Sequence, residues 1–235
     1  MTLQTLVDAA RHIVFFGGAG VSTESGIPDF RSQDGLYQQK YDYPPETILS
    51  HSFFVHRTEE FYRFYRDKML PSGVQPNAAH RKLAEMEQKG RLDAVVTQNI
   101  DGLHQAAGSR RVFELHGSIH RNYCTRCRRF YPLSAIAEST GIPRCECGGI
   151  IKPDVVLYEE NLDDEVVSGA VNAIRAADLL IVAGSSLSVY PAAGLLGYFR
   201  GDAIALINRD PTPMDSSATL LCREKVGEVL GALHI

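Results

Sequence analysis

The chain has 235 residues, of which 44% are hydrophobic and 22% are charged, and its formal net charge is -4. A chain of this length and composition can bury a full core and fits one large globular domain, or one domain with a small satellite. The negative charge excludes a general attraction to nucleic acid or anionic membranes, and no run approaches the roughly 20 apolar residues that span a bilayer.

The chain begins with an amphipathic segment, residues 1–12, that contains Asp8 and leads directly into an apolar run. We interpret this segment as a first helix and not as a targeting peptide. We therefore expect a cytoplasmic protein, and a monomer without nucleic-acid or membrane partners.

Apolar runs that end in small or polar residues predict the strands of a parallel sheet. They lie at residues 13–16, 92–96, 112–115, 179–183 and 203–207, and helical stretches between them include 77–88 and 164–176. Continuous apolar strands that alternate with helices are typical of a parallel sheet covered on both faces. We therefore expect an α/β fold with a doubly wound nucleotide-binding sheet, and a ligand beyond the carboxyl ends of its strands.

A glycine-rich turn, residues 17–20 (GGAG), follows the first predicted strand. Thr23 stands where the third glycine of a dinucleotide fingerprint would be, and no acidic residue ends a second strand about 20 residues later. The turn alone fits either a plain strand-to-helix turn or a phosphate cradle, in which small residues and the following helix present N–H groups. Residues 184–186 (GSS) could add a second contact, and Asn208 could hydrogen-bond a ribose.

Two segments interrupt the strand–helix pattern and are expected to form a small domain. Residues 33–75, rich in Tyr, Phe and His, would be a helical insertion, and residues 120–152 would be a metal-binding module. The large domain would then consist of residues 1–32, 76–119 and 153–235.

The second insertion holds two close cysteine pairs, Cys124 with Cys127 and Cys145 with Cys147. Four converging thiolates suit one structural zinc ion and leave it no open position for water. The usual pattern has two residues inside each pair, so the second turn must be tighter. Two disulfides are the alternative, which a reducing compartment disfavours. The fifth cysteine, Cys222, is expected to be a small core residue.

An arginine-rich run surrounds the first cysteine pair: Arg121, Arg126, Arg128 and Arg129. It could be a solvated face, or it could meet an acidic partner.

Together these segments resemble the sirtuin family, the NAD-dependent protein lysine deacylases. The matching segments are residues 18–31 (GAGVSTESGIPDFR), 97–104 (TQNIDGLH), 114–117 (ELHG), the four cysteines, 184–187 (GSSL) and Asn208. They occur in the family's order and span nearly the whole chain. The resemblance implies a Rossmann-type large domain and a small domain of zinc module plus helical insertion, with NAD and an acyl-lysine peptide in the cleft between them.

The resemblance also implies which residues contact NAD. They are Gly18, Ala19, Gly20, Thr23, Asp29, Phe30, Arg31, Gln98, Asn99, Ile100, Asp101, His116, Gly184, Ser185, Ser186, Asn208 and Lys225.

Three of these residues are implied to be catalytic. His116 would be the general base, Asn99 would order the site and its water, and Asp101 would hold the nicotinamide carboxamide. Taken alone, His116 could be a core histidine and Asp101 a helix cap, since Asp is a common cap. Histidine titrates near neutral pH, which suits a base that activates a ribose hydroxyl. The implied products are nicotinamide, deacylated lysine and O-acetyl-ADP-ribose.

The acyl-lysine peptide would pair as a strand with the main chain of the protein. The matching positions are Val156, Leu157, Tyr158 and Val189. The loop departs from the family's usual Phe-Gly-Glu, because residues 158–160 read Tyr-Glu-Glu. Two adjacent carboxylates beside the groove suggest a liking for substrates with basic flanks.

The preferred acyl group follows from a second departure. Succinyl-preferring family members carry a Tyr-x-x-Arg pair in the helical insertion, and the corresponding residues here are Tyr62 and Tyr65. Arg63 and Arg66 lie on neighbouring faces, about 100° away. We therefore expect uncharged acyl groups to be preferred over succinyl.

Two other functions share part of this pattern. An ADP-ribosyltransferase would use the same cofactor residues, but His116 favours deacylation. A non-catalytic zinc-ribbon module that binds nucleic acid is disfavoured by the net charge and by the complete catalytic set.

Overall fold

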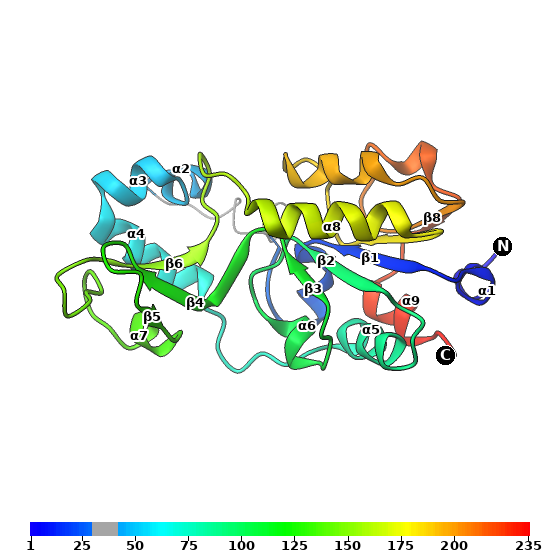
Figure 1. Cartoon of the computed structure of the whole chain (residues 1–235), viewed down its shortest axis with the longest axis horizontal. Helices are drawn as coiled ribbons and strands as arrows, with labels where there is room; N and C mark the ends of the chain where they lie inside the picture. The colour runs from blue at the N-terminus through cyan, green and yellow to red at the C-terminus, as the bar shows by residue number, and fades with distance from the viewer. Residues whose placement is uncertain (30–41) are drawn as a thin grey trace.

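A six-stranded parallel sheet forms the centre of the larger lobe in the computed structural model, which describes residues 1–29 and 42–235 (Figure 1). Its order is β3-β2-β1-β7-β8-β9, and every neighbouring pair is parallel. The strands are β1 (Ile13–Gly17), β2 (Ala94–Thr97), β3 (Val112–Glu114), β7 (Leu179–Ala183), β8 (Ala203–Ile207) and β9 (Leu220–Cys222). The order reverses between β1 and β7, and this switch point opens a crevice at the carboxyl ends of the strands.

The predicted α/β class is confirmed, and each of the predicted strands is present. The strand β9 was not predicted, because it has only three residues and none of them is fully buried. It pairs at the edge of the sheet, where no continuous apolar run is needed.

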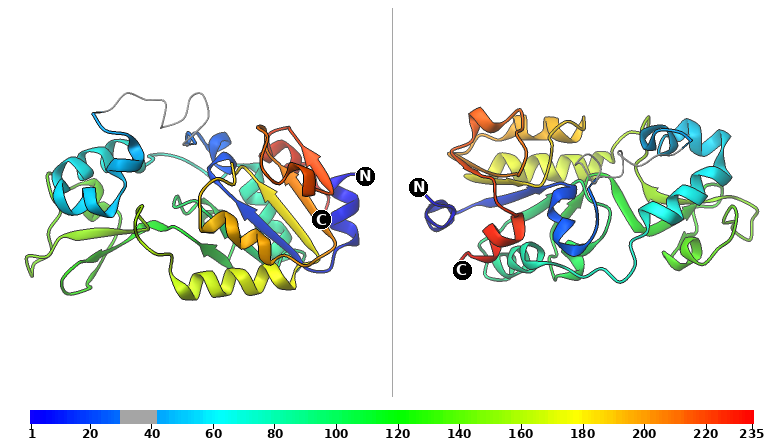
Figure 2. Two further views of the ribbon diagram at one scale, coloured as in Figure 1. Left: turned by 90° about the horizontal axis from the view of Figure 1, so that it is seen from above. Right: turned by 180° about the vertical axis from the view of Figure 1, so that it is seen from behind.

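Helices cover both faces of the sheet (Figures 1 and 2). Successive strand residues point to opposite faces, so that Phe15 packs into one core cluster and Phe16 into the other. The first cluster includes residues of α1 (Leu3–Ala9), α5 (Ala78–Gln88) and α9 (Val226–Gly231). The second includes residues of α8 (Asp164–Ala176) and of the 3-10 segment η5 (Ala192–Tyr198).

The two long helices begin at side chains that the sequence marks as caps. Asn77 accepts hydrogen bonds from the N–H groups of Ala79 and His80 at the start of α5. Asp163 accepts from those of Glu165 and Val166 at the start of α8. Each cap satisfies donors that have no partner inside the helix, which explains where these helices start.

The smaller lobe contains an antiparallel sheet of order β5-β4-β6. Its strands are β4 (Gly117–Cys124), β5 (Phe130–Tyr131) and β6 (Ile151–Val155), and its helices are α2 (Pro45–Ile48), α3 (His51–His56), α4 (Thr58–Phe64), the π-helical η4 (Tyr65–Met69) and α7 (Ser134–Ala137). Aromatic residues of α3 and α4, such as Phe54 and Phe61, share one core with Ile119 and Ile151 of the sheet. The helical insertion and the cysteine-containing segment are therefore one packed unit.

The exact division of the chain into domains stays a prediction. The strands β4 and β6 run across the expected boundaries at 120 and 152, since β4 begins at Gly117 and β6 ends at Val155.

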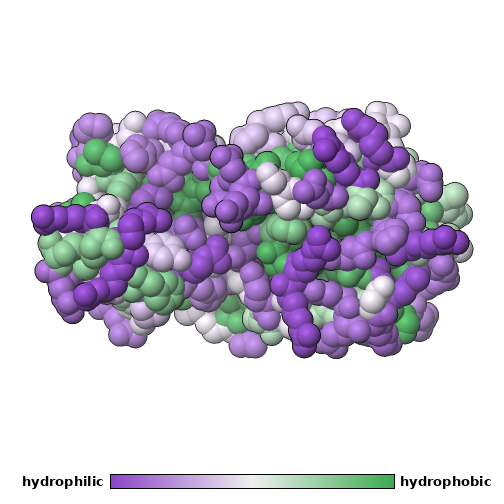
Figure 3. All heavy atoms as spheres, viewed as in Figure 1, coloured by the Kyte–Doolittle hydropathy of each residue, from purple (hydrophilic) through white to green (hydrophobic). Residues whose placement is uncertain are grey.

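Hydrophilic residues cover most of the face in Figure 3, and hydrophobic residues show there only in small separate areas. Within the described part of the chain, no helix combines the length and the hydropathy needed to cross a bilayer.

Candidate active site

A cavity of about 730 Å³ lies between the two lobes, at the carboxyl ends of the strands of the large sheet. A volume of this size is typical of a site for a small-molecule ligand. The cavity is lined by nearly every residue predicted to bind NAD or the peptide: Gly18, Ala19, Gly20, Thr23, Asp29, Gln98, Asn99, Ile100, Asp101, His116, Val156, Leu157, Tyr158, Gly184, Ser185, Ser186, Val189, Asn208 and Lys225. The exceptions are Phe30 and Arg31, which lie outside the described residues. The fold thus brings together segments that are far apart in the sequence, while the role of each residue stays a prediction.

Glycines bring the loops after β1 and β7 into direct contact at the switch point. The N–H of Gly20 donates to the carbonyl of Gly184 at 2.8 Å, and Gly184 has a left-handed backbone with φ 59°. A Cβ at Gly20 would lie 2.8 Å from the Cα of Gly184. The helix that we expected after this turn is absent: two short 3-10 segments, η1 (Ala19–Val21) and η2 (Thr23–Ser25), follow β1.

Gly184→Ala is expected to destabilise the fold and weaken NAD binding together. The new Cβ would lie 2.4 Å from the N atom of Val21 and would sit on a left-handed backbone. Strain and overpacking of this kind cost about 2–4 kcal/mol, which thermal unfolding with and without NAD would measure. Gly197→Ala is the matched control, because no described atom outside its own helical segment and chain neighbours lies within 4 Å of its added Cβ. We call the close contact of Gly18 and Gly20 with Gly184 the glycine cradle. Equal effects in the two variants would contradict its predicted role in NAD binding.

A hydrogen-bond network joins the loops after β1 and β2. The hydroxyl of Ser22 donates to Asp101 Oδ2 at 2.7 Å and accepts from Asn99 Nδ2 at 3.0 Å. Asp101 Oδ1 accepts from the N–H of Leu103, the first residue of α6 (Leu103–Ala106). Asp101 therefore does bond the start of a helix, and the same carboxylate also lines the cavity.

Sequence reasoning assigned no role to Ser22, although Ser22 lies within the segment 18–31 that carries the resemblance. Its side chain is almost completely buried, with 1% exposed. A buried hydroxyl placed between two predicted site residues fixes both of them, and only the structure shows that contact.

His116 follows β3 and lines the same cavity. Its Nδ1 lies 3.0 Å from the carbonyl oxygen of Gln98, which can only accept a hydrogen bond. This contact assigns the proton of the neutral ring to Nδ1 and leaves Nε2 able to take a proton. Burial lowers the pKa of His116, and the bond to Gln98 offsets only part of that effect. The ring is therefore neutral at pH 7, as a general base must be.

The four clustered cysteines fit one zinc ion. Their sulfur atoms all lie within 4.8 Å of one another, with 3.4 Å between Cys124 and Cys147 and 3.5 Å between Cys127 and Cys145. Zinc–sulfur bonds of about 2.3 Å in a tetrahedron place sulfur atoms about 3.8 Å apart. A disulfide needs about 2.05 Å, so the structure does not support the disulfide alternative.

The cysteine cluster lies apart from the cavity, since none of the four lines it. Main-chain N–H groups of Cys127 and Arg126 point at the sulfur of Cys124 and lower the pKa of that thiol, which favours the thiolate that a metal requires. A Cβ at Gly149 would lie 2.6 Å from the same sulfur, so the tight second turn depends on glycine.

Two of the four arginines near the cysteines form ion pairs, and one of these pairs, between Arg121 and Glu114 of β3, links the two lobes. Arg121 contacts Glu114 and Asp154, and Arg129 contacts Glu146. Cys222, expected to be a core residue, is only partly buried and packs on the core from β9.

The predicted peptide loop, residues 156–160, lies against the helical insertion. The N–H of Tyr158 donates to the carbonyl of Leu49 at 3.0 Å, and the N–H of His51 donates to the carbonyl of Tyr158 at 2.9 Å. The main chain of Tyr158 is therefore already paired with the protein. The main chain of Leu157 is likewise paired, since its N–H donates to the carboxylate of Glu160 at 2.9 Å and its carbonyl accepts from the N–H of Glu160 at 3.0 Å.

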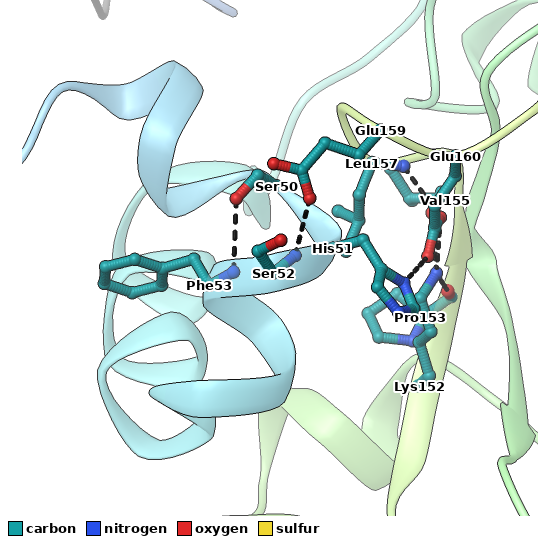
Figure 4. A network of polar contacts seen from close by, with 10 residues as sticks. All are labelled: Ser50, His51, Ser52, Phe53, Lys152, Pro153, Val155, Leu157, Glu159 and Glu160. Carbon is teal, nitrogen blue, oxygen red and sulfur yellow. Dashed lines mark hydrogen bonds and ion pairs between the residues drawn. The ribbon is translucent and has the colours of Figure 1, made fainter.

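Both acidic residues of this loop are bonded inside the protein (Figure 4). Glu159 accepts from the N–H of Ser52 at 2.8 Å. Glu160 contacts His51, Lys152 and the N–H of Leu157 at 2.9–3.0 Å. Glu160 is paired with Lys152, whereas the exposed Glu159 bonds a main-chain N–H, which does not neutralise its charge, so the suggested liking for basic flanks stays a prediction.

The residues of the expected acyl pair lie outside the cavity. Tyr62 and Tyr65 are fully buried in the core of the small lobe, and the hydroxyl of Tyr62 donates to the carbonyl of Ile151. Arg66 is turned toward α7 and the residues that follow it, where it bonds the carbonyl of Ile136 and the hydroxyl of Ser139. Of the cationic residues in the described part of the helical insertion, only Lys68 lines the cavity, and its ammonium lies 3.1 Å from Asp67.

Comparison with known proteins gives concordant results. Residues 18–191 match the family model described as "Sir2 family". The chain is 57% identical to an NAD-dependent protein deacetylase of Clostridium acetobutylicum over 97% of this chain and 95% of the relative, and 52% identical to one of Cutibacterium acnes over 97% and 94%.

Solved structures agree with the sequence relatives. A Sir2 with a deacetylated p53 peptide and 3′-O-acetyl ADP-ribose has a TM-score of 0.90 and 40% identity, covering 98% of this chain and 96% of that chain. A Sir2 with p53 peptide and NAD+ has a TM-score of 0.86 and 41% identity, covering 96% and 93%.

Proposed function

Because the chain belongs to the Sir2 family and is an NAD-dependent protein deacylase, we propose that it removes acetyl groups from lysine side chains of proteins. The reaction would release nicotinamide and O-acetyl-ADP-ribose and leave the deacetylated lysine in the substrate protein. The observation that carries this proposal is the position of His116. This partly buried, neutral base lines the cavity that also contains the glycine cradle and the peptide loop.

The cradle and its neighbours would hold NAD across the switch point. Gly18, Gly20 and Gly184 allow the main chain to come close to phosphates, and Gln98 Nε2 donates to the hydroxyl of Ser185 at 2.8 Å, which joins the loops after β2 and β7. NAD supplies a good leaving group, nicotinamide, on an anomeric carbon. The protein's task is to hold the weakly nucleophilic acyl oxygen in line with that carbon and to exclude water.

The network of Ser22, Asn99 and Asp101 would order the nicotinamide end of the site. Since Ser22 bonds both other side chains, it fixes their orientation before any ligand arrives. Polar groups that are already oriented need no rearrangement during the reaction, so they stabilise charge that develops at the nicotinamide end of the site more effectively.

The Nε2 atom of His116 would take a proton from a ribose hydroxyl. The carbonyl of Gln98 keeps the other ring nitrogen protonated and stabilises the imidazolium that forms. One structural zinc would be held by the four cysteines away from this chemistry, because four thiolates leave no open coordination position.

The proposal is tested by mass spectrometry of an acetyl-lysine peptide incubated with the protein, with and without NAD. The expected result is loss of the acetyl group only with NAD, together with O-acetyl-ADP-ribose. A gain of ADP-ribose mass on protein without loss of acetyl would instead indicate an ADP-ribosyltransferase.

We further propose that uncharged acyl groups are preferred. Kinetics with acetyl-lysine and succinyl-lysine peptides should give a kcat/KM ratio of about 100 or more, because an unpaired carboxylate in a dry site costs about 3 kcal/mol or more. Butyryl-lysine, which has a similar chain length but no charge, is the control. Comparable rates for succinyl would contradict the proposal, and loss of that succinyl activity in Lys68→Met would identify the responsible cation.

A further inference from the structure

Glu159 has a backbone conformation that ordinarily favours glycine. Its φ is 75°, and it is one of only three non-glycine residues with positive φ among the described residues. A residue with a Cβ is strained there, so the conformation persists only where surrounding contacts hold it.

The side chain of Glu159 supplies such a contact. Its carboxylate accepts from the N–H of Ser52 in the first turn of α3, at 2.8 Å, and in Figure 4 it points toward α3 and away from Glu160. Hydrogen bonds from Ser52 lower the pKa of Glu159, so the carboxylate is charged at neutral pH. A charged acceptor makes a stronger bond to a main-chain N–H than a neutral one does.

The neighbours of Glu159 are fastened on both sides. Tyr158 exchanges main-chain hydrogen bonds with residues 49 and 51, and Glu160 is held by Lys152 and by the N–H of Leu157. Between these two anchors, the left-handed turn at Glu159 decides how the loop runs along the cavity.

We propose that Glu159 is a positioning residue of the substrate groove: its bond to Ser52 holds the loop 156–160 in the shape on which the acyl-lysine peptide binds. This inference rests on the proposed function. Glycine at position 159 would adopt the left-handed turn without strain but could not bond Ser52. Alanine would be strained in the turn and could not bond Ser52 either. Glutamine would keep an acceptor for the N–H of Ser52.

Steady-state kinetics of Glu159→Ala, Glu159→Gly and Glu159→Gln test the proposal. We expect KM for the acetyl-lysine peptide to rise about tenfold in the alanine variant and about threefold in the glycine variant, and to change less than about twofold in the glutamine variant. KM for NAD should stay within about twofold in all three, because Glu159 contacts no part of the glycine cradle. Glu138→Ala, an exposed glutamate outside the cavity lining, is the control.

Equal peptide KM values in all variants would overturn the inference, and so would a glutamine variant as impaired as alanine. If the alanine variant does not fold, the glycine and glutamine variants decide the matter by themselves. Titration calorimetry with the acetyl-lysine peptide separates this inference from the proposed function. A wild-type protein that binds the peptide but never deacetylates it would refute the function, while weaker binding by Glu159→Gly would still support the role of Glu159.

Discussion

His116→Ala is expected to lower kcat for deacetylation by about 1,000-fold while NAD binding changes little. A positioned general base typically contributes about 100- to 10,000-fold, and the substituted protein keeps the glycine cradle intact. Single-turnover assays with saturating acetyl-lysine peptide and NAD measure the loss, and calorimetry measures NAD affinity. His234→Ala, an exposed histidine near the chain end, should behave as wild type. Retention of more than about a tenth of the wild-type rate would remove His116 from the proposed role.

The same histidine should give a pH signature. Because burial lowers the pKa of His116, the neutral base persists below the ordinary histidine pKa of about 6.5. The acidic limb of kcat/KM should therefore lie below pH 6.5. The sign for stability is the same: a depressed folded-state pKa means that the unfolded chain binds the proton more readily, so this contribution is present above pH 6.5 and is lost as pH falls through the folded value.

The parts of the fold that the sequence predicted share one physical property. The strands β7 and β8 match the predicted limits fully, because central parallel strands are covered on both faces and read as unbroken apolar runs. The edge strand β9 is apolar too, but it has only three residues and is not fully buried, so its run is too short to predict a strand. The helix expected after the glycine turn is also missing, since contact with the loop at Gly184 holds the chain in short 3-10 turns instead.

The candidate site was predictable where a short motif carries its own chemistry. The cysteine spacing predicted the metal cluster, and the strand-end segments predicted the residues of the cavity. Contacts between distant segments could not be predicted in this way. Glu159 and Ser52 are 107 positions apart, so nothing local shows that the carboxylate faces the insertion and not the substrate. Tyr62 and Tyr65 likewise occupy the positions that correspond to the acyl-binding pair, but packing places them in a core outside the cavity.

Cys145→Ser is expected to unfold the small lobe and abolish deacetylation, although Cys145 lies outside the cavity. The cluster ties the turn after β4 to the turn at residues 145–147, and Cys124 and Cys145 are part of the same core as the helical insertion. Structural zinc in isolated peptides binds with about 10–16 kcal/mol, which matches the whole stability of an ordinary domain, about 5–15 kcal/mol. The peptide loop pairs with residues 49 and 51 of this lobe, so it should lose its shape when the lobe does.

Metal analysis, thermal unfolding and peptide binding together test this expectation. Wild-type protein should contain one zinc per chain, and Cys145→Ser should contain almost none, with a Tm lower by about 10 °C or more. Cys222→Ser is the matched control, because this cysteine lies on β9 in the large sheet and should leave zinc content and Tm unchanged. NAD should still protect the large lobe of Cys145→Ser from unfolding, since the glycine cradle lies in the loops that follow β1 and β7 of the parallel sheet. A variant that lacks zinc yet keeps full peptide affinity would show that the metal does not support the groove.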